Sequence, residues 1–255
     1  MSEYSSLAAV ERTFIIIKAL VGKVNGLSVS KLVEETGLSK SIVSRILKTL
    51  TNNNYVEQDD ETRFYRLSLD FIGLSLKHFN TLGIDGVFSP ALKKISQEVQ
   101  ELVQLAVVQN RNVYFVHKIE GNKQLKVADM LGKQAPLNST AAGKLWLSSL
   151  PKSEIISLIS NQEMKKYTEN TITNIDELLD ELQNIRDLGY AVSNEEFNQG
   201  VIGVAVPIYS NDNSLIATIV ITVPTVRMPK DRIQEIVSIC KKYIATLDQQ
   251  LPLPH

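Results

Sequence analysis

The chain has 255 residues, 44% of them hydrophobic, and 27 basic against 28 acidic side chains give it a formal net charge of −1. At about 150 residues per domain, this length predicts one large domain or two modest ones with substantial cores. The composition excludes collagen-like, low-complexity and wholly disordered chains. The near-neutral charge carries no global basic signal, so any evidence for a nucleic-acid partner must be local.

The sequence predicts a cytoplasmic protein without a metal or cofactor. The N-terminus lacks a basic segment followed by an apolar stretch, which argues against a signal peptide, and no run of 18 apolar residues could span a membrane. Cys240 is the single cysteine, so no intramolecular disulfide can form, as is typical of a reducing compartment. His78, His117 and His255 are too far apart in sequence for metal-ligand spacing.

The first 69 residues show the order of elements of a winged helix-turn-helix. In the first helix, Leu7, Val10, Phe14 and Ile17 share one face. Gly37 breaks the second helix, and a serine then provides an N-cap for the third. Three helices followed by a β-hairpin are typical of this DNA-binding module. The expected elements are helices at residues 7–21, 28–36 and 40–53 and strands at 55–57 and 63–67, with the helix-turn-helix at about 29–48.

The third helix carries a local cationic face, with three basic residues and no acidic one between Gly37 and Tyr55. A helix of this kind fits the major groove, where Arg45 is the candidate for bidentate contact with a guanine and the lysines for phosphate contacts. The alternative is a solvated face on an ordinary three-helix unit, but motif, hairpin and charge together favour DNA. The predicted DNA-contacting residues are Ser39, Lys40, Ser41, Ser44, Arg45, Lys48 and Arg63. On the hairpin, Arg63 and Arg66 could contact a neighbouring phosphate or reach the minor groove.

The rest of the chain is predicted to form a linker helix at 70–84 and a second domain at 85–253. Strands arranged mostly as hairpins, with helices around them, indicate an α+β domain on an antiparallel sheet. Such an architecture is sensor-like, although fold alone does not set function. The expected helices follow Pro90, begin near residue 139 or 140, run from Asn174 to Gly189 and cover 229–247, and the expected strands are 102–109, 113–119, 124–131, 190–193, 201–209 and 215–223.

Residues 132–144 could hold an anion, because a polar N-cap and small residues expose the free N–H groups of a helix start. Packing of small residues explains the stretch equally well, and it does not match a P-loop. Enzymatic motifs are absent from the sequence. We expect Glu195 and Glu196 to lie in a solvated turn, His117 to be a packed or edge histidine, and Cys240 to be a buried thiol.

Several spaced motifs resemble the IclR family of bacterial transcription regulators over nearly the full chain. They include residues 38–50 around the predicted third helix, 132–144 with Thr140 and Lys144, and the run from Glu196 to Pro207. The resemblance implies a winged helix-turn-helix that dimerises, often as a dimer of dimers, and a GAF-like domain that binds a small metabolite. It also implies an effector pocket formed by Leu131 (or Met130), Ser139, Thr140, Ala141, Ala142, Ser193, Gly203, Val220 and Thr222.

The sequence departs from many relatives at three positions, with Ser193 in place of Asp, Gly203 in place of Cys and Asn138 in place of His. Loss of an acid and a larger cavity predict an anionic effector different from, and bulkier than, glyoxylate-like acids. We therefore expect a ligand-responsive regulator that binds a palindromic operator. Three alternatives stay open at this point: a second domain that binds no effector, an enzyme acting on a small acid with the helix-turn-helix used for oligomerisation, and a module whose winged helix contacts protein.

Overall fold

The computed structural model describes residues 7–81, 83–160, 164–229 and 231–247. The chain divides into two compact units, and the boundary follows Thr81. Within the described part of the chain, no helix is long and apolar enough to cross a membrane. Positions 82, 161–163, 230 and 248–253 of the expected elements and domains lie outside the described residues, as does His255.

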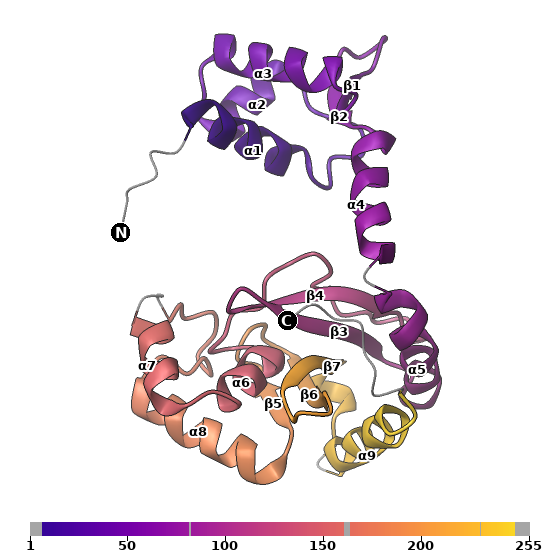
Figure 1. Ribbon diagram of the computed structural model, residues 1–255, viewed down its shortest axis with the longest axis vertical. Coiled ribbons are helices and arrows are strands. Elements are labelled where there is room, and N and C mark those ends of the chain that lie inside the picture. The colour runs from indigo at the N-terminus through magenta and orange to yellow at the C-terminus, as the bar shows by residue number, and fades with distance from the viewer. Residues whose placement is uncertain (1–6, 82, 161–163, 230, 248–255) are drawn as a thin grey trace. The chain divides into compact units, whose positions relative to one another are not determined.

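The first unit is a small helical core with a β-hairpin (Figure 1). The two strands of the hairpin are antiparallel and pair Val56 with Leu67. The core consists of side chains from three helices and the first strand, and its fully buried members include Leu32, Val43 and Leu47. The elements are α1 (Ala8–Leu20), α2 (Val29–Thr36), α3 (Lys40–Asn52), β1 (Val56–Gln58), β2 (Tyr65–Leu67) and α4 (Leu69–Thr81).

Local capping explains the turn between α2 and α3. Ser28 caps α2 by accepting a hydrogen bond from the backbone N–H of Lys31. Gly37 ends α2 with a φ of 68°, a left-handed conformation that glycine adopts without a Cβ penalty. Leu38 then packs against the core, so the chain turns and α3 begins at Lys40. The predicted helix-turn-helix and hairpin are confirmed.

The apolar face predicted for the first helix is not its buried face. The buried residues of α1 are Ile16 and Leu20, one turn apart on the helix. Leu7, Val10 and Phe14 are exposed, with Phe14 at 56%. A unit of this size needs only a narrow stripe of α1 for its core, which leaves the predicted face uncovered.

Helix α4 is a single helix with no buried residue. Its apolar side chains Leu69, Ile72 and Leu76, which recur at helical spacing, are all exposed. The helix ends at Thr81 rather than at the expected residue 84, where a new helix begins.

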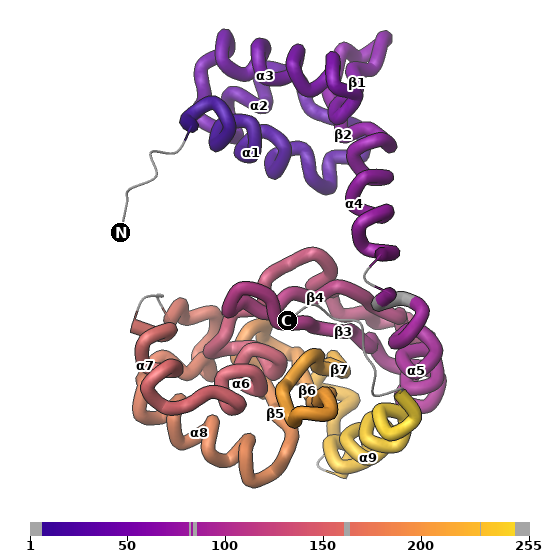
Figure 2. Tube along the Cα trace, viewed as in Figure 1, coloured from indigo at the N-terminus to yellow at the C-terminus, as the bar shows by residue number. Residues whose placement is uncertain are grey.

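The second unit is built on a five-stranded antiparallel sheet in the order β4-β3-β7-β6-β5 (Figure 2). The neighbouring strands pair Leu105 with Ile219, Val206 with Ile219 and Ala191 with Ala205. The elements are α5 (Ile84–Val99), β3 (Leu102–Gln109), β4 (Asn112–Ile119), α6 (Ala141–Ser148), α7 (Lys152–Ser160), α8 (Ile175–Leu188), β5 (Ala191–Asn194), β6 (Val201–Tyr209), β7 (Leu215–Pro224), the 3-10 helix η1 (Thr225–Arg227) and α9 (Arg232–Ile244).

The sheet is covered by helices on both faces, which confirms the predicted α+β class. Successive side chains of a strand point to opposite faces, so Ala106 and Val220 share one face while Leu105 and Ile219 share the other. The first face packs in one core cluster with residues of α6 and α8. Helices α5 and α9 lie side by side against β3, β4 and β6 (Figure 1).

Two predicted elements of this unit differ from the structure. Helix α5 begins at Ile84, so Pro90 lies inside the helix rather than before it. The strand expected at residues 124–131 is absent, because only the following segment pairs with the edge strand β4. There Gly132 donates its backbone N–H to Phe115, and Ala135 donates to Val113. Residues 124–131 are irregular.

Candidate functional site

The exposed side of α3 carries three cations that pair with no acidic side chain in the part of the chain that the structure describes. Lys40, Arg45 and Lys48 are exposed, and among the described residues none of them forms an ion pair. Ser39 precedes the helix, but its side chain caps no N–H group of the first turn. Those N–H groups and the three cations are therefore all available to an anionic partner. The predicted residues Ser39, Lys40, Ser41, Ser44, Arg45 and Lys48 are all exposed on or beside this helix.

The hairpin contributes less positive charge than its composition indicates. Arg66 donates to Glu57 directly across the two strands at 2.5 Å, and this hydrogen bond raises the pKa of the arginine. Arg63 lies at the end of the turn, exposed, with Asp60 at 4.0 Å. Of the two hairpin arginines, Arg63 is the one that a nucleic-acid phosphate could recruit at little cost, because an exposed pair at this distance is weak.

The second unit has a hollow between the sheet and the N-terminus of α6, with a cavity volume of about 50 Å³. This volume accommodates several water molecules or a molecule of a few heavy atoms without side-chain movement. The floor comes from β3, β6 and β7, and the rim from residues 127–130 and 197–201. The lining residues are Gln104, Phe115, Val127, Ala128, Met130, Thr140, Ala141, Ala142, Ser193, Phe197, Asn198, Val201, Gly203, Val220 and Thr222.

The cavity offers hydrogen bonds but no charged side chain among those lining residues. Thr140 caps α6 by accepting from the N–H of Gly143, which leaves the earlier N–H groups at Ala141 and Ala142 for a ligand. Ser193 donates its hydroxyl to the carbonyl of Ser139 at 2.6 Å. An anion at this place would be held by backbone dipoles rather than by a countercharge.

Most of the residues predicted for the pocket come together in this cavity. Ser139 lies behind the wall, fully buried, and contributes only its carbonyl to Ser193. Leu131 is 44% exposed and does not line the cavity, where Met130 takes the apolar position. The predicted residues that line it are Thr140, Ala141, Ala142, Ser193, Gly203, Val220 and Thr222.

Sequence reasoning missed the rim and the polar floor. Phe197 and Asn198 follow a strand in a stretch that was interpreted as a solvated turn, and Val127 lies in a segment that was predicted to be a strand. Gln104 is an amide within the buried first part of β3, residues 102–106, which is otherwise apolar. That polar residue within a buried strand was the available signal, since buried amides need partners.

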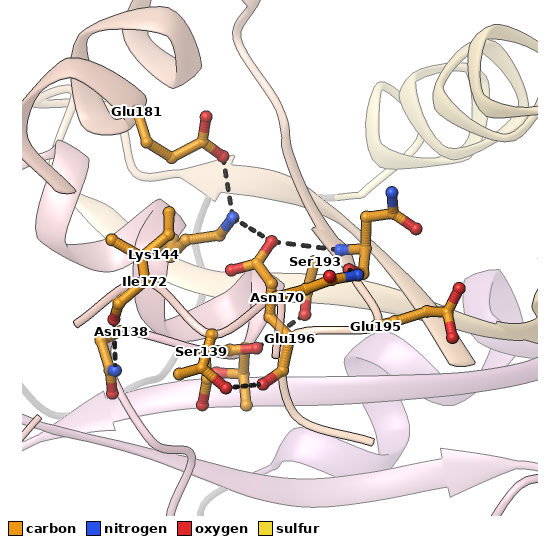
Figure 3. A network of polar contacts seen from close by, with 12 residues as sticks. Asn138, Ser139, Lys144, Asn170, Ile172, Glu181, Ser193, Glu195 and Glu196 are labelled. Carbon is orange, nitrogen blue, oxygen red and sulfur yellow. Dashed lines mark hydrogen bonds and ion pairs between the residues drawn. The ribbon is translucent and has the colours of Figure 1, made fainter. Parts of the chain in front are cut away.

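Behind the cavity, Lys144 joins three elements through a buried ion cluster (Figure 3). Its side chain is fully buried, and its Nζ lies 2.8 Å from Glu181 of α8 and 2.7 Å from Glu196 after β5. The expectation of a solvated turn was therefore wrong for Glu196, which is only 6% exposed. The sequence around Glu196 could not show this burial, because the partner Lys144 lies in α6, 52 residues earlier in sequence.

The environment of Glu196 is unfavourable for its charge in spite of Lys144. Its Oε1 accepts from Lys144 and from the N–H of Asn194, whereas its Oε2 is buried without a hydrogen-bond partner in the described structure. Burial raises the pKa of this carboxyl above its ordinary value, outweighing the opposing effect of Lys144.

The loop that contains Glu195 and Glu196 is fixed by threonine hydroxyls of the segment before α8, which donate hydrogen bonds to backbone carbonyls of the loop. The hydroxyl of Thr171 donates to the carbonyl of Glu196 at 2.6 Å, and that of Thr168 to the carbonyl of Glu195 at 2.6 Å. Tyr167 stacks edge-on against Phe197 with ring centroids 4.9 Å apart. The loop that forms one rim of the cavity is thus held by two hydrogen bonds and one aromatic contact.

Cys240 and His117 both lie in the second unit, outside the cavity lining. Cys240 is fully buried in α9, as predicted, and burial raises the pKa of its thiol to about 12, so it is not a reactive group at neutral pH. His117 lies on the edge strand β4 and is partly buried. No group of three or more potential metal ligands occurs among the residues that the structure describes.

Family models match both units of the chain. The model of the IclR helix-turn-helix domain matches residues 9–60, and that of the bacterial transcriptional regulator IclR C-terminal domain matches residues 77–248. The chain belongs to the IclR family. It is a ligand-responsive DNA-binding transcription regulator and not an enzyme.

Individual IclR-family relatives agree with this assignment. The HTH-type transcriptional regulator KdgR of Escherichia coli K12 is 30% identical over 233 residues, which cover 91% of this chain and 88% of KdgR. The crystal structure of Thermotoga maritima IclR is 26% identical, with a TM-score of 0.78 over 95% of this chain and 98% of that one. An IclR homologue from Microbacterium hydrocarbonoxydans, complexed with 4-hydroxybenzoate, shares the fold with a TM-score of 0.79 and 20% identity, over 94% and 98% of the two chains.

Proposed function

We propose that this regulator acts in the cytoplasm as a homo-oligomer on a palindromic operator, under the control of a small anionic metabolite. Helix α3 of each protomer enters a major groove, and the effector occupies the cavity at the N-terminus of α6. The observation that carries the DNA-binding part is the exposed face of α3, where Lys40, Arg45 and Lys48 have no acidic partner among the described residues.

The roles of these residues follow from their positions along α3. Arg45 lies in the middle of the exposed face, flanked one turn away by Ser41 and Lys48, and its planar fork matches the acceptor pair of a guanine. Lys48 is closer to the end of the helix and suits a phosphate. Arg63, on the hairpin, adds a phosphate contact beside the groove.

Oligomerisation is supported by apolar surface that the first unit leaves uncovered. Val10 and Phe14 are exposed on α1, Leu7 is exposed directly before it, and Leu69 and Ile72 are exposed on α4. Clustered exposed apolar side chains of this kind mark interaction surfaces. A two-fold homodimer requires two half-sites related by the same symmetry, which gives the operator its palindromic form.

The chemical class of the effector is inferred from the polarity of the cavity. Free N–H groups at Ala141 and Ala142 favour a carboxylate, and the neutral lining places no acid against it. Gly203 faces the cavity, and a Cβ at this position would meet the Cβ of Ala141 at 3.5 Å, so the missing side chain enlarges the space. The 4-hydroxybenzoate bound by the homologue of the same fold supports an organic acid. The preference for acids bulkier than glyoxylate stays a prediction.

Selection of bound duplexes from a random pool, at two salt concentrations, tests the proposal. We expect an enriched palindrome and a fall of log K with log salt of about 0.9 per phosphate contact. Arg45→Ala should reduce discrimination against mismatched bases by about 1–3 kcal/mol, whereas Lys48→Ala should weaken binding to all sequences alike. Uniform loss of affinity in both variants would show that Arg45 contacts phosphate only. Failure to enrich any sequence would refute the operator-binding role.

A further inference from the structure

Gln104 is the most deeply buried amide that faces the effector cavity. It lies on the central part of β3, only 2% exposed, and it lines the hollow opposite the N-terminus of α6. The rest of the buried face of this strand is apolar. A buried polar side chain destabilises the folded state unless its donors and acceptors form hydrogen bonds.

The two ends of this amide contact different parts of the cavity wall. Its Oε1 accepts the backbone N–H of Met130 at 2.9 Å, and its Nε2 donates to the hydroxyl of Thr222 at 3.3 Å. Met130 belongs to the irregular segment 127–131, which forms one rim of the cavity. Gln104 therefore connects the sheet floor directly to that rim.

The amide has one donor left over. A glutamine side chain carries two N–H groups, and only the bond to Thr222 is formed from Nε2 among the described residues. The Thr222 hydroxyl accepts this bond, and its own hydrogen is free to point into the cavity. Two donors thus lie on the sheet side, while the N–H groups of Ala141 and Ala142 lie on the helix side.

We propose that Gln104 is a specificity-determining residue for the effector, selecting acids that carry a second oxygen and holding segment 127–131 against the bound ligand. This inference rests on the proposed function, in which the carboxylate occupies the α6 N-terminus. The second oxygen, a hydroxyl or keto group, then accepts from Gln104 and Thr222. An acid without that oxygen leaves buried donors unsatisfied, and a site of this kind rejects such analogues strongly.

A neighbouring contact supplies a matched control. Lys118, which pairs with Gln104 in the register of β3 and β4, binds Asp129 of the same segment through an ion pair. Lys118 does not line the cavity. Lys118→Met therefore removes a contact of the segment without changing the cavity lining, whereas Gln104→Met removes a contact and also the donor that faces the ligand.

The experiment uses the full-length chain and two pairs of acids, lactate with propionate and 4-hydroxybenzoate with benzoate, titrated by calorimetry. We expect the wild type to prefer the oxygen-bearing member of at least one pair by tenfold or more. Gln104→Met should reduce that ratio to about one, and Lys118→Met should leave it unchanged. Gln104→Glu replaces the donor by an oxygen and should also abolish the preference, which provides a second variant if Gln104→Met does not fold.

Hydrogen exchange of residues 127–131 without ligand tests the holding role. We expect exchange at Met130 to be about tenfold faster in Gln104→Met and close to wild type in Gln104→Glu, which retains the acceptor. An acid ratio that survives Gln104→Met, or collapses equally in Lys118→Met, would overturn the selecting role. Unchanged exchange in Gln104→Met would overturn the holding role.

Operator binding, measured on the same preparations, separates this inference from the proposed function. If none of the four acids binds a wild-type protein that still binds its operator, both the anionic effector and the selecting role of Gln104 are wrong, while operator binding stands. If the acids bind with the expected ratios and no operator is found, the role of Gln104 stands and the operator-binding proposal fails.

Discussion

Replacement of Lys144 by methionine should destabilise the effector-binding unit strongly. The side chain is fully buried and its Nζ lies 2.8 Å from Glu181 and 2.7 Å from Glu196. Methionine preserves most of the volume but leaves Glu196 as a buried charge without a countercharge. Removing one partner of a buried ion pair costs about 3–5 kcal/mol. Since Glu181 is 29% exposed and can be hydrated, we expect about 3 kcal/mol.

The cost of Lys144→Met should depend on pH. In the wild type, burial raises the pKa of Glu196 above its ordinary value. The folded state therefore binds this proton more readily than the unfolded chain. The corresponding stabilisation is complete below the ordinary glutamate pKa and is lost as the pH rises through the folded-state pKa. Without Lys144 this pKa rises further, so the protonated carboxyl should reduce the cost of the substitution at pH 5 compared with pH 8.

Urea unfolding of the full-length chain at pH 5 and pH 8 measures both effects, followed by a probe of the second unit such as its single tryptophan, Trp146. At an m-value of about 2 kcal/mol/M, a cost of about 3 kcal/mol lowers the midpoint by about 1.5 M. Lys242→Met is the matched control, because its pair with Glu98 is largely exposed and should contribute less than about 1 kcal/mol. A cost below about 1 kcal/mol at pH 8, or the same cost at both pH values, would refute the reasoning.

Two further predictions concern backbone approach and self-association. In Gly143→Ala the new Cβ would lie 2.5 Å from the carbonyl oxygen of Pro136, so we expect the free energy of unfolding in urea to fall by about 2 kcal/mol. In Gly203→Ala the nearest atom is at 3.5 Å, so this variant should fold normally and bind the effector more weakly in calorimetry. Equal stability of the two variants would contradict this reasoning. Phe14→Glu places a charge on the exposed face of α1, so sedimentation equilibrium should show a shift toward monomer, and an unchanged mass would exclude that face from the interface.

The local elements of this protein are determined by its sequence, because the signals that begin and end them are local. Gly37 and Gly189 end helices in the left-handed conformation, and Asn174 caps α8 by accepting from two N–H groups of its first turn. The hairpin between β3 and β4 turns at Asn110 and Arg111, both with positive φ.

The resemblance to the IclR family implied most of the residues that line the cavity. Thr140, Ala141 and Ala142 form a helix start, and Ser193 and Gly203 pair across neighbouring strands. These residues meet because the helix start packs on the same face of the sheet to which those strand positions point. The exposed cations of α3 were predicted from the residues themselves, because the chain has three basic residues and no acidic one between Gly37 and Tyr55.

Only the tertiary structure decided which faces are covered and which polar groups are paired. The periodicity of α1 shows an apolar face but cannot show that Ile16 and Leu20, rather than Phe14, meet the core. Glu196 is buried because Lys144, distant in sequence, arrives from α6. Residues 124–131 have strand-like composition, yet their hydrogen bonds go to side chains such as Gln104. In each case the deciding partner is distant in sequence. A local sequence pattern cannot show such a contact, because the contact forms only when the chain folds.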